Sequence, residues 1–285
     1  LDASNAGAQT RNQKLYEEFD RAREKNPEKV ARWYDNAQIV RREAAGLYAF
    51  IDSLKLEIVR FADDSEISTS FSSINAMFND SSANSTSMYT YFQEASYHKL
   101  NIHTSFFPAP MGNTVLSYQD TFPRNYYEPY DATTNPNGYL ESQRADRELS
   151  LWQRAIAYIN ANYPVPSSLN IDYDNDGLVD NVVFIVKGAN GGWNDLLWPH
   201  KWAIYDRTVN LGNKRVYTFN LQLEGSGSSY FNTSVLCHEM AHTLGAPDLY
   251  RYYVSTSVSP AGAWDLMCNN SNPPQHMSAY MKWKY

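Results

Sequence analysis

The 285-residue sequence has little cysteine, no excess of basic residues and no long hydrophobic run. Its two cysteines cannot form the dense disulfide framework of small secreted domains. With 31 acidic and 24 basic residues, the formal net charge is −7, so we expect no basic face that would bind the phosphates of a nucleic acid. No stretch of about 18 apolar residues is present, so no membrane-spanning helix is expected.

The main chemical signal is a short motif near the C-terminal end, His238-Glu239-Met240-Ala241-His242. On a helix, His238 and His242 project from one face one turn apart, where two neutral imidazoles can bind one Zn²⁺. Glu239 lies beside the first histidine and can take a proton from a zinc-bound water without itself being a ligand. This arrangement is typical of metal-assisted hydrolysis.

A third absence narrows the choice of the remaining ligand. No glutamate follows Glu239, so a glutamate from a later helix cannot complete the site. The oxygen ligand must therefore be an aspartate, either Asp248 or Asp265. Gly245 follows the second histidine at a place where a helix could end in a left-handed turn.

The pattern HExxHxxGxxD, followed by Gly262-Ala263-Trp264-Asp265-Leu266-Met267, resembles the metzincin zinc peptidases and is similar to their immune inhibitor A-like group. The resemblance implies an aspartate as third ligand, a glutamate as general base and a methionine turn beneath the zinc. Some metzincins carry a zinc-binding tyrosine two residues after that methionine, and Asn269 stands there in this chain. The implied residues are His238, His242 and Asp248 as zinc ligands, Glu239 as base, and Met267 and Gly245 in structural roles.

The same resemblance implies an α/β (α+β) fold with a twisted, mostly parallel sheet, a backing helix, an active-site helix and a small C-terminal subdomain. We expect a catalytic domain over residues 51–285, with an upper part to about 245 and a lower part over 246–285. Hydrophobic periodicity predicts the individual elements. Strands are predicted at 55–61, 99–106, 181–186 and 215–223, and helices at 71–78, 88–95, 141–161 and 273–283.

Residues 1–50 form a charged segment with two helical patterns between 13 and 48. We interpret it as a prosegment or an added helical subdomain, and without a cysteine in this stretch a cysteine switch is excluded. The chain begins at Leu1 without an apolar signal region, which indicates a mature or trimmed form. Further domains beyond Tyr285 are left open.

A second metal signal precedes the predicted strand at 181–186. Carboxylates stand at relative positions 1, 3, 5 and 9 of residues 172–180, and Gly177 at position 6 suits the sharp turn of a calcium loop. Position 12 is Val183 rather than glutamate, so the stretch is not a complete EF-hand loop. The alternative is a turn without an ion. The predicted Ca²⁺ ligands are Asp172, Asp174, Asp176, the carbonyl of Leu178, and Asp180.

Two further features each leave two interpretations open. His200 lies in the cluster Trp198-Pro199-His200-Lys201-Trp202, where it could contact substrate or simply pack among tryptophans. Cys237 and Cys268 flank the zinc motif and the methionine turn, and they form either a disulfide or two buried thiols.

The expected function is that of a zinc-dependent endopeptidase, secreted or extracytoplasmic and bacterial, in which Glu239 activates a zinc-bound water against peptide bonds of extracellular proteins. Its partners would be protein or peptide substrates, and its cofactors Zn²⁺ and a structural Ca²⁺. The alternative is a non-catalytic binding module stabilised by zinc and calcium on a peptidase-like scaffold. The sequence gives no indication of cleavage specificity or oligomeric state.

Overall fold

The computed structural model describes residues 54–193, 195–226, 229–250 and 259–285, and a mostly parallel β-sheet runs through its centre. The predicted helical segment 1–50 lies outside the described residues. The strand order is β2-β1-β4-β8-β5, with β3 pairing beside the end of β1. Only β5 runs antiparallel, at the edge next to β8. The strands are β1 (Leu54–Arg60), β2 (Thr104–Phe107), β3 (Tyr118–Gln119), β4 (Val182–Val186), β5 (His200–Ala203) and β8 (Thr218–Leu223).

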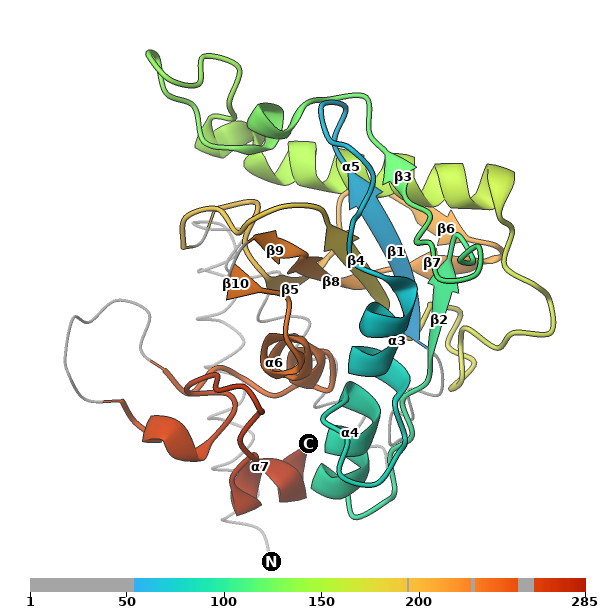
Figure 1. Ribbon diagram of the computed structural model, residues 1–285, viewed down its shortest axis with the longest axis vertical. Helices are drawn as coiled ribbons and strands as arrows, with labels where there is room; N and C mark the ends of the chain where they lie inside the picture. The colour runs from blue at the N-terminus through green and yellow to red at the C-terminus, as the bar shows by residue number, and fades with distance from the viewer. Residues whose placement is uncertain (1–53, 194, 227–228, 251–258) are drawn as a thin grey trace, which may run out of the picture. The chain divides into compact units, whose positions relative to one another are not determined.

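Helices cover both faces of this sheet (Figure 1). The long helix α5 (Glu141–Asn162) packs on one face, where Trp152 stacks on Phe184 of β4 at 4.1 Å between ring centroids. On the other face, an apolar cluster combines residues of three larger helices and Met281 near the C-terminus with Val183 and Ile185 of β4. These helices are α3 (Phe71–Asn79), α4 (Met88–Ala95) and α6 (Thr233–Thr243). All five residues of β4 are buried, as expected for a strand covered on both faces.

The strand register brings polar side chains beneath α6. Val183 of β4 pairs with Asn220 of β8, and Ile185 pairs with Gln222. Because paired residues in a sheet point to the same face, Asn220 and Gln222 lie on the α6 side, while Phe219 and Leu221 belong to the apolar cluster under α5. The α6 face therefore carries polar groups within an otherwise apolar sheet.

The predicted strands and helices are confirmed in type, and three of them differ in extent. Predicted strand 99–106 begins only at Thr104, because the chain turns at Tyr97 and His98, which have φ of 55° and 61°. Predicted strand 215–223 is divided between β7 and β8, and predicted helix 273–283 starts only after Ser278. The smaller elements are β6 (Val209–Leu211), β7 (Lys214–Val216), β9 (Gly225–Ser226), β10 (Ser229–Tyr230), η1 (Arg124–Tyr127), η2 (Gly262–Trp264) and α7 (Ala279–Lys284).

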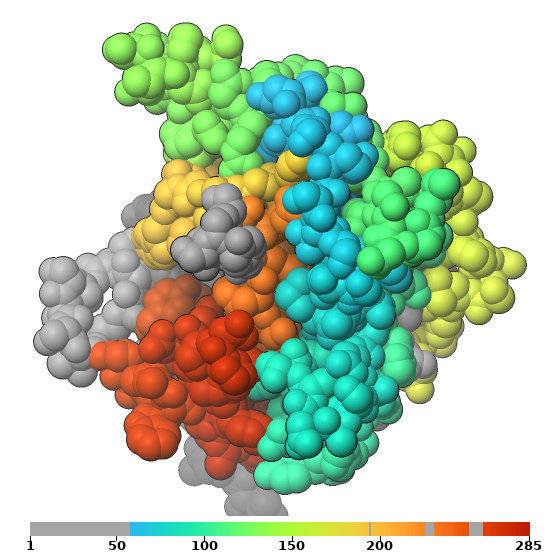
Figure 2. Space-filling view, viewed as in Figure 1, coloured from blue at the N-terminus to red at the C-terminus, as the bar shows by residue number. Residues whose placement is uncertain are grey.

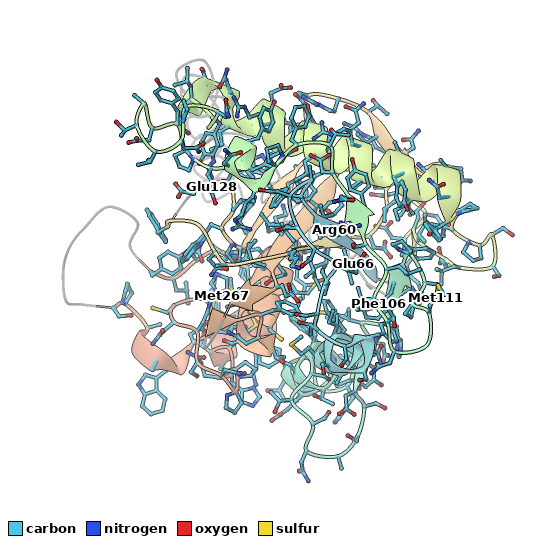
Figure 3. All side chains as sticks on the ribbon, turned by 45° about the horizontal axis from the view of Figure 1, so that its top comes forward. Arg60, Glu66, Phe106, Met111, Glu128 and Met267 are labelled. Carbon is cyan, nitrogen blue, oxygen red and sulfur yellow. The ribbon has the colours of Figure 1, made fainter. Side chains whose placement is uncertain are left out.

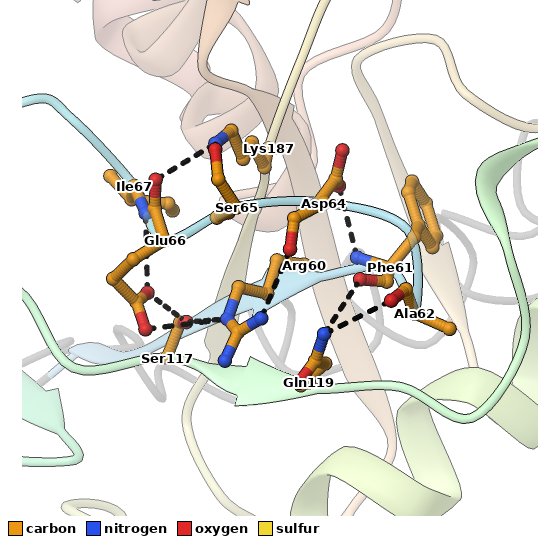
Figure 4. A network of polar contacts seen from close by, with 10 residues as sticks. All are labelled: Arg60, Phe61, Ala62, Asp64, Ser65, Glu66, Ile67, Ser117, Gln119 and Lys187. Atoms are coloured by element: carbon orange, nitrogen blue, oxygen red, sulfur yellow. Dashed lines mark hydrogen bonds and ion pairs between the residues drawn. The ribbon is translucent and has the colours of Figure 1, made fainter.

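The carboxyl ends of β1 and β4 are covered by the loop that follows β1 (Figure 4). Arg60 bonds Ser117 at 3.1 Å and forms an ion pair with Glu66 at 3.3 Å. Lys187, just after β4, donates to the carbonyls of Ser65 and Glu66, each at 2.8 Å. Open α/β sheets commonly bind ligands at such strand ends, where the connections diverge to opposite faces. Here the chain's own polar residues fill that position.

The C-terminal residues 259–285 lie against residues of the α3–α4 region on the face shown in Figure 2. The hydroxyl of Tyr91 on α4 donates to the carbonyl of Gln275 at 3.1 Å. Met267, labelled in Figure 3, is fully buried in the same apolar cluster as α4 and α6. This packing sets the turn at Met267 against the face of α6.

Candidate metal centre

Helix α6 begins and ends with hydrogen bonds that define its length. The side chain of Asn232 caps the first turn by accepting from the backbone of Val235 at 3.0 Å. At the other end, Gly245 has φ of 102° and donates to the carbonyl of His242 at 3.0 Å. Ala246 donates to the carbonyl of Ala241 at 3.0 Å, which completes a Schellman motif. The chain therefore turns back sharply after the second histidine.

That turn brings Asp248 to the histidines of α6. Nε2 of His238 lies 2.9 Å from Oδ1 of Asp248, and Nε2 of His242 lies 3.3 Å from the same oxygen. The ligand atoms of these three residues all lie within 4.8 Å of one another. The side chains of His238 and Asp248 are 5% and 8% exposed, and that of His242 is 18% exposed, so the cluster is reached by solvent from the His242 side.

The hydrogen bonds of the two imidazoles test whether this cluster suits a metal. Nδ1 of His238 lies 2.9 Å from the carbonyl of Leu266, and Nδ1 of His242 lies 2.6 Å from the carbonyl of Ala246. A carbonyl can only accept, so each Nδ1 carries a proton and each Nε2 is directed at Asp248. The carboxylate therefore needs positive charge at these nitrogens, from a bound cation or from a proton on an imidazole. Two nitrogens and one oxygen suit Zn²⁺, and the backbone carbonyls supply the outer hydrogen bonds usual for metal-binding histidines.

Without a metal, a proton takes part of this role. Burial lowers the pKa of His238, but the hydrogen bond to Asp248 and the negative charges of Glu239 and Asp248 outweigh it and raise that pKa to about 9. Burial raises the pKa of Asp248, and the hydrogen bonds from both histidines more than offset this, holding it well below its usual range. Asp248 is therefore ionised, as a metal ligand must be.

The second aspartate that the sequence left open, Asp265, does not join this cluster. Its Oδ1 accepts from the backbone of Met267 at 2.9 Å, and its Oδ2 accepts from the backbone of Ser278 at 2.7 Å. Both oxygens are thus bound to peptide N–H groups of the C-terminal segment. The structure brings Asp248, and not Asp265, to the histidines.

Two neighbours of the cluster were missed by sequence reasoning. The oxygen of Asn220 on β8 accepts from the hydroxyl of Thr243 on α6 at 3.3 Å. With its amide turned so that both groups are satisfied, Asn220 instead donates to the carbonyl of Glu239 at 3.3 Å and accepts from Asn181 at 2.9 Å. The ring of Tyr250 stacks on His238, with 6.3 Å between ring centroids and 20° between planes. Asn220 could have been suspected as a polar residue within the apolar strand Phe219–Leu223, whereas nothing local marks Tyr250.

His200 is not brought to the histidine cluster. It pairs with Leu221 in the sheet, so its ring lies on the α5 face, opposite α6. Its Nε2 lies 2.7 Å from Oε1 of Glu148 on α5, and its Nδ1 lies 2.5 Å from the carbonyl of Trp198. The ring therefore links the edge strand to the backing helix.

The aspartate loop forms a compact turn with its own cationic partner. Ligand oxygens of Asp172, Asp174 and Asp176 lie within 4.8 Å of one another. Lys214 donates to Oδ2 of Asp172 at 2.6 Å, which lowers the pKa of that carboxyl against the opposing effect of burial. Asp180 accepts from the backbone of Tyr173 at 3.1 Å. The fold thus gathers three of the predicted ligands, and an ammonium group already offsets part of their charge.

The two cysteines are free thiols. Cys237 is fully buried within α6, and burial raises its pKa well above the usual value. Cys268 lies 3.6 Å from the carbonyl of Leu249 and 2.9 Å from the hydroxyl of Ser259. Of the two alternatives that the sequence left open, the structure contains the pair of buried thiols.

Comparison with protein families supports a metallopeptidase. Residues 159–278 match the family described as the catalytic domain of immune inhibitor A peptidase M6. This range contains the aspartate loop 172–180 and the cluster of His238, His242 and Asp248. Residues 1–97 match a family described as the GldM N-terminal domain. Each match spans less than half of the chain.

Among solved structures, the chain is similar to a crystal structure of metalloproteinase-II from Bacteroides fragilis. The sequences are 15% identical, the TM-score is 0.37, and the match covers 82% of this chain and 52% of the other. The chain therefore spans about half the length of that protein, and a TM-score of this size does not establish a common fold. No curated protein matches the chain.

Proposed function

We propose that this chain is a zinc-dependent endopeptidase of the metzincin type. The observation that carries the proposal is the convergence of Nε2 of His238 and Nε2 of His242 on Oδ1 of Asp248, with both Nδ1 atoms bound to carbonyls. The match of residues 159–278 to a peptidase family supports the same chemistry.

In this proposal, His238, His242 and Asp248 hold the metal, and Zn²⁺ supplies Lewis acidity toward the scissile carbonyl. Glu239 follows the first histidine on α6 and is 6% exposed, so its carboxylate works in a site that admits little solvent. It takes a proton from the attacking water and passes it to the leaving amine. Asn220 of β8 bonds α6 beneath Glu239, through the hydroxyl of Thr243 at 3.3 Å.

Among the described residues, β5 pairs with β8 along one side and stands at the end of the strand order. In this proposal, the 2.7 Å contact between His200 and Glu148 holds β5 against α5, a supporting role in place of direct substrate contact.

We propose a secreted or extracytoplasmic location, with proteins or peptides as substrates. No helix among the described residues has the length and apolar character needed to span a membrane. A structural Ca²⁺ in the loop Asp172–Asp180 would add its charge beside Lys214, and residues 1–50 would act as a prosegment or an added subdomain.

The proposal is tested with the full chain and its Glu239→Gln variant. Bound zinc is measured by elemental analysis, and hydrolysis of a broad peptide library is followed before and after limited proteolysis of the N-terminal segment. We expect about one zinc per chain in both proteins. Only the unsubstituted chain should cleave peptides. Absence of zinc refutes the proposal, whereas zinc without any cleavage favours the binding module.

A further inference from the structure

The backbone of the turn at Leu266 and Met267 contacts one proposed ligand directly and the neighbour of another. The carbonyl of Leu266 accepts from Nδ1 of His238 at 2.9 Å. The carbonyl of Met267 accepts from the N–H of Leu249, the residue after Asp248, at 2.7 Å. The orientation of this one turn therefore sets both the ring of the first histidine and the place of the aspartate.

The carboxylate of Asp265 holds this turn in position. Asp265 is 0% exposed, and its two oxygens accept from Met267 at 2.9 Å and from Ser278 at 2.7 Å. Met267 lies inside the turn, and Ser278 is the N-cap residue of α7. One buried carboxylate thus fastens the turn to the N-cap residue of the last helix.

A carboxylate suits this position better than its amide would. Each oxygen of Asp265 faces a peptide N–H, and a carboxylate can accept at both. An asparagine would accept at one oxygen and place its NH₂ group against the other N–H. A buried donor without an acceptor is costly, so the turn would have to move.

We propose that Asp265 is a positioning residue of the metal centre, acting through the Leu266 and Met267 carbonyls on His238 and Asp248. This inference rests on the proposed metal centre. Asp265 is not a ligand of that centre but holds the turn that bonds to it. Outer hydrogen-bond partners of metal ligands commonly contribute on the order of 10- to 100-fold in metal affinity. The same range is expected for Asp265.

The test compares Asp265→Asn with Asp120→Asn in the full chain. Asp120 is also buried, 2% exposed, and belongs to the α5 side of the sheet, where Arg154 binds it. Both variants remove one buried carboxylate, but only Asp265 contacts the turn. Zinc Kd is measured by competition with a chromophoric chelator. The visible spectrum of bound Co²⁺ reports the geometry of the site.

We expect Asp265→Asn to weaken zinc binding on the order of 10- to 100-fold and to change the Co²⁺ spectrum. Asp120→Asn should leave both unchanged, even if it lowers the stability of the fold. An unaltered Kd and spectrum for Asp265→Asn overturn the inference, and so does equal weakening by Asp120→Asn. If the unsubstituted chain binds no zinc, the proposed metal centre itself fails, which is a separate result.

A second variant covers the case in which Asp265→Asn does not fold. Ser278 has φ of −60°, which proline can adopt, so Ser278→Pro removes one N–H donor and keeps the carboxylate. Compared with the unsubstituted chain, zinc binding should weaken and the Co²⁺ spectrum should change. A folded Ser278→Pro protein with an unchanged Kd and spectrum also contradicts the inference.

Discussion

Replacing Asp120 by asparagine tests how firmly the backing helix α5 is attached to the sheet. Asp120 follows β3 and is bound bidentately by Arg154 of α5, at 2.8 Å from Nε and 3.1 Å from Nη2. It also accepts from the hydroxyl of Tyr118 at 2.8 Å and from that of Tyr127. Asparagine keeps the size of the side chain and removes its charge and one acceptor oxygen.

The loss in free energy of unfolding depends on Arg154, whose charge would remain without a partner. The side chain of Arg154 is 29% exposed and that of Asp120 is 0% exposed, so the remaining guanidinium would stay largely buried without its counter-ion. Breaking such a pair costs about 3–5 kcal/mol when both groups are fully buried. Because Arg154 retains some contact with water, we expect the lower end, about 3 kcal/mol. For a domain of this size that lowers Tm by about 6–12 °C.

The assay is urea denaturation in EDTA, followed by fluorescence. The matched control is Asp146→Asn, because Asp146 also pairs with an arginine, Arg207 at 2.6 Å, but is 73% exposed. Exposed pairs contribute about 0–1 kcal/mol, so this variant should stay close to the unsubstituted chain. Equal loss of stability in both variants would refute the argument from burial.

The pH dependence of stability gives a second test of the bond between Asp120 and Arg154. Burial raises the pKa of Asp120, but the hydrogen bonds from Arg154 and from the two tyrosines outweigh it and hold that pKa below its usual range. A lowered pKa means that stability from this group is complete above about pH 4, the unfolded value, and is lost as pH falls through the folded one. The difference between Asp120→Asn and the unsubstituted chain should therefore shrink in acid.

Three other predictions concern the metal sites. Glu239→Gln should lower kcat by about 10²–10⁴-fold with zinc retained, since only proton transfer is removed; peptide hydrolysis and zinc content check this. Without metal the pKa of His238 is about 9, so zinc binding at pH 7 should release a proton. Zinc affinity should therefore increase with pH up to about 9, and calorimetry in two buffers measures the proton release. Stability that the metal-free fold gains from His238 is complete below about pH 6.5 and is lost as pH rises through 9. Lys214→Met removes the partner of Asp172 at 2.6 Å and should lower Tm in EDTA, with recovery in millimolar Ca²⁺; no recovery would contradict the calcium proposal.

Much of the fold follows from periodicity because its strands and helices bury whole faces. The apolar run Val182–Val186 predicts a strand covered on both sides, and the stripe on α5 predicts a helix against the sheet; both are found. The C-terminal segment was harder to predict. Helix α7 starts at Ala279 and not at the prolines. The N–H of its N-cap residue Ser278 is bound by Asp265, a contact between residues 13 positions apart. Such a tertiary hydrogen bond leaves no local pattern.

In the candidate site, too, some features follow from local sequence and others depend on tertiary contacts. The spacing of His238 and His242 on one helix face is local, and Gly245 marks the turn that returns the chain, so these features could be predicted. The choice between Asp248 and Asp265 could not be made from spacing alone, because it depends on which carboxylate meets backbone N–H groups after the chain has turned. The position of His200 required the strand register, which places it on the face away from α6.

The structure gives the two aspartates complementary tasks that the sequence presents as alternatives. Asp248 faces two imidazole nitrogens, and its low pKa favours a cation between them. Asp265 faces two peptide N–H groups, and its bonds need no cation. The turn at Leu266 and Met267 connects the two aspartates. Its N–H at Met267 bonds Asp265, and its carbonyls bond His238 and the residue after Asp248. The proposed metal centre takes its ligands from α6 and from the segment after Gly245, so it needs such a connection, since neither segment alone would fix all three ligands.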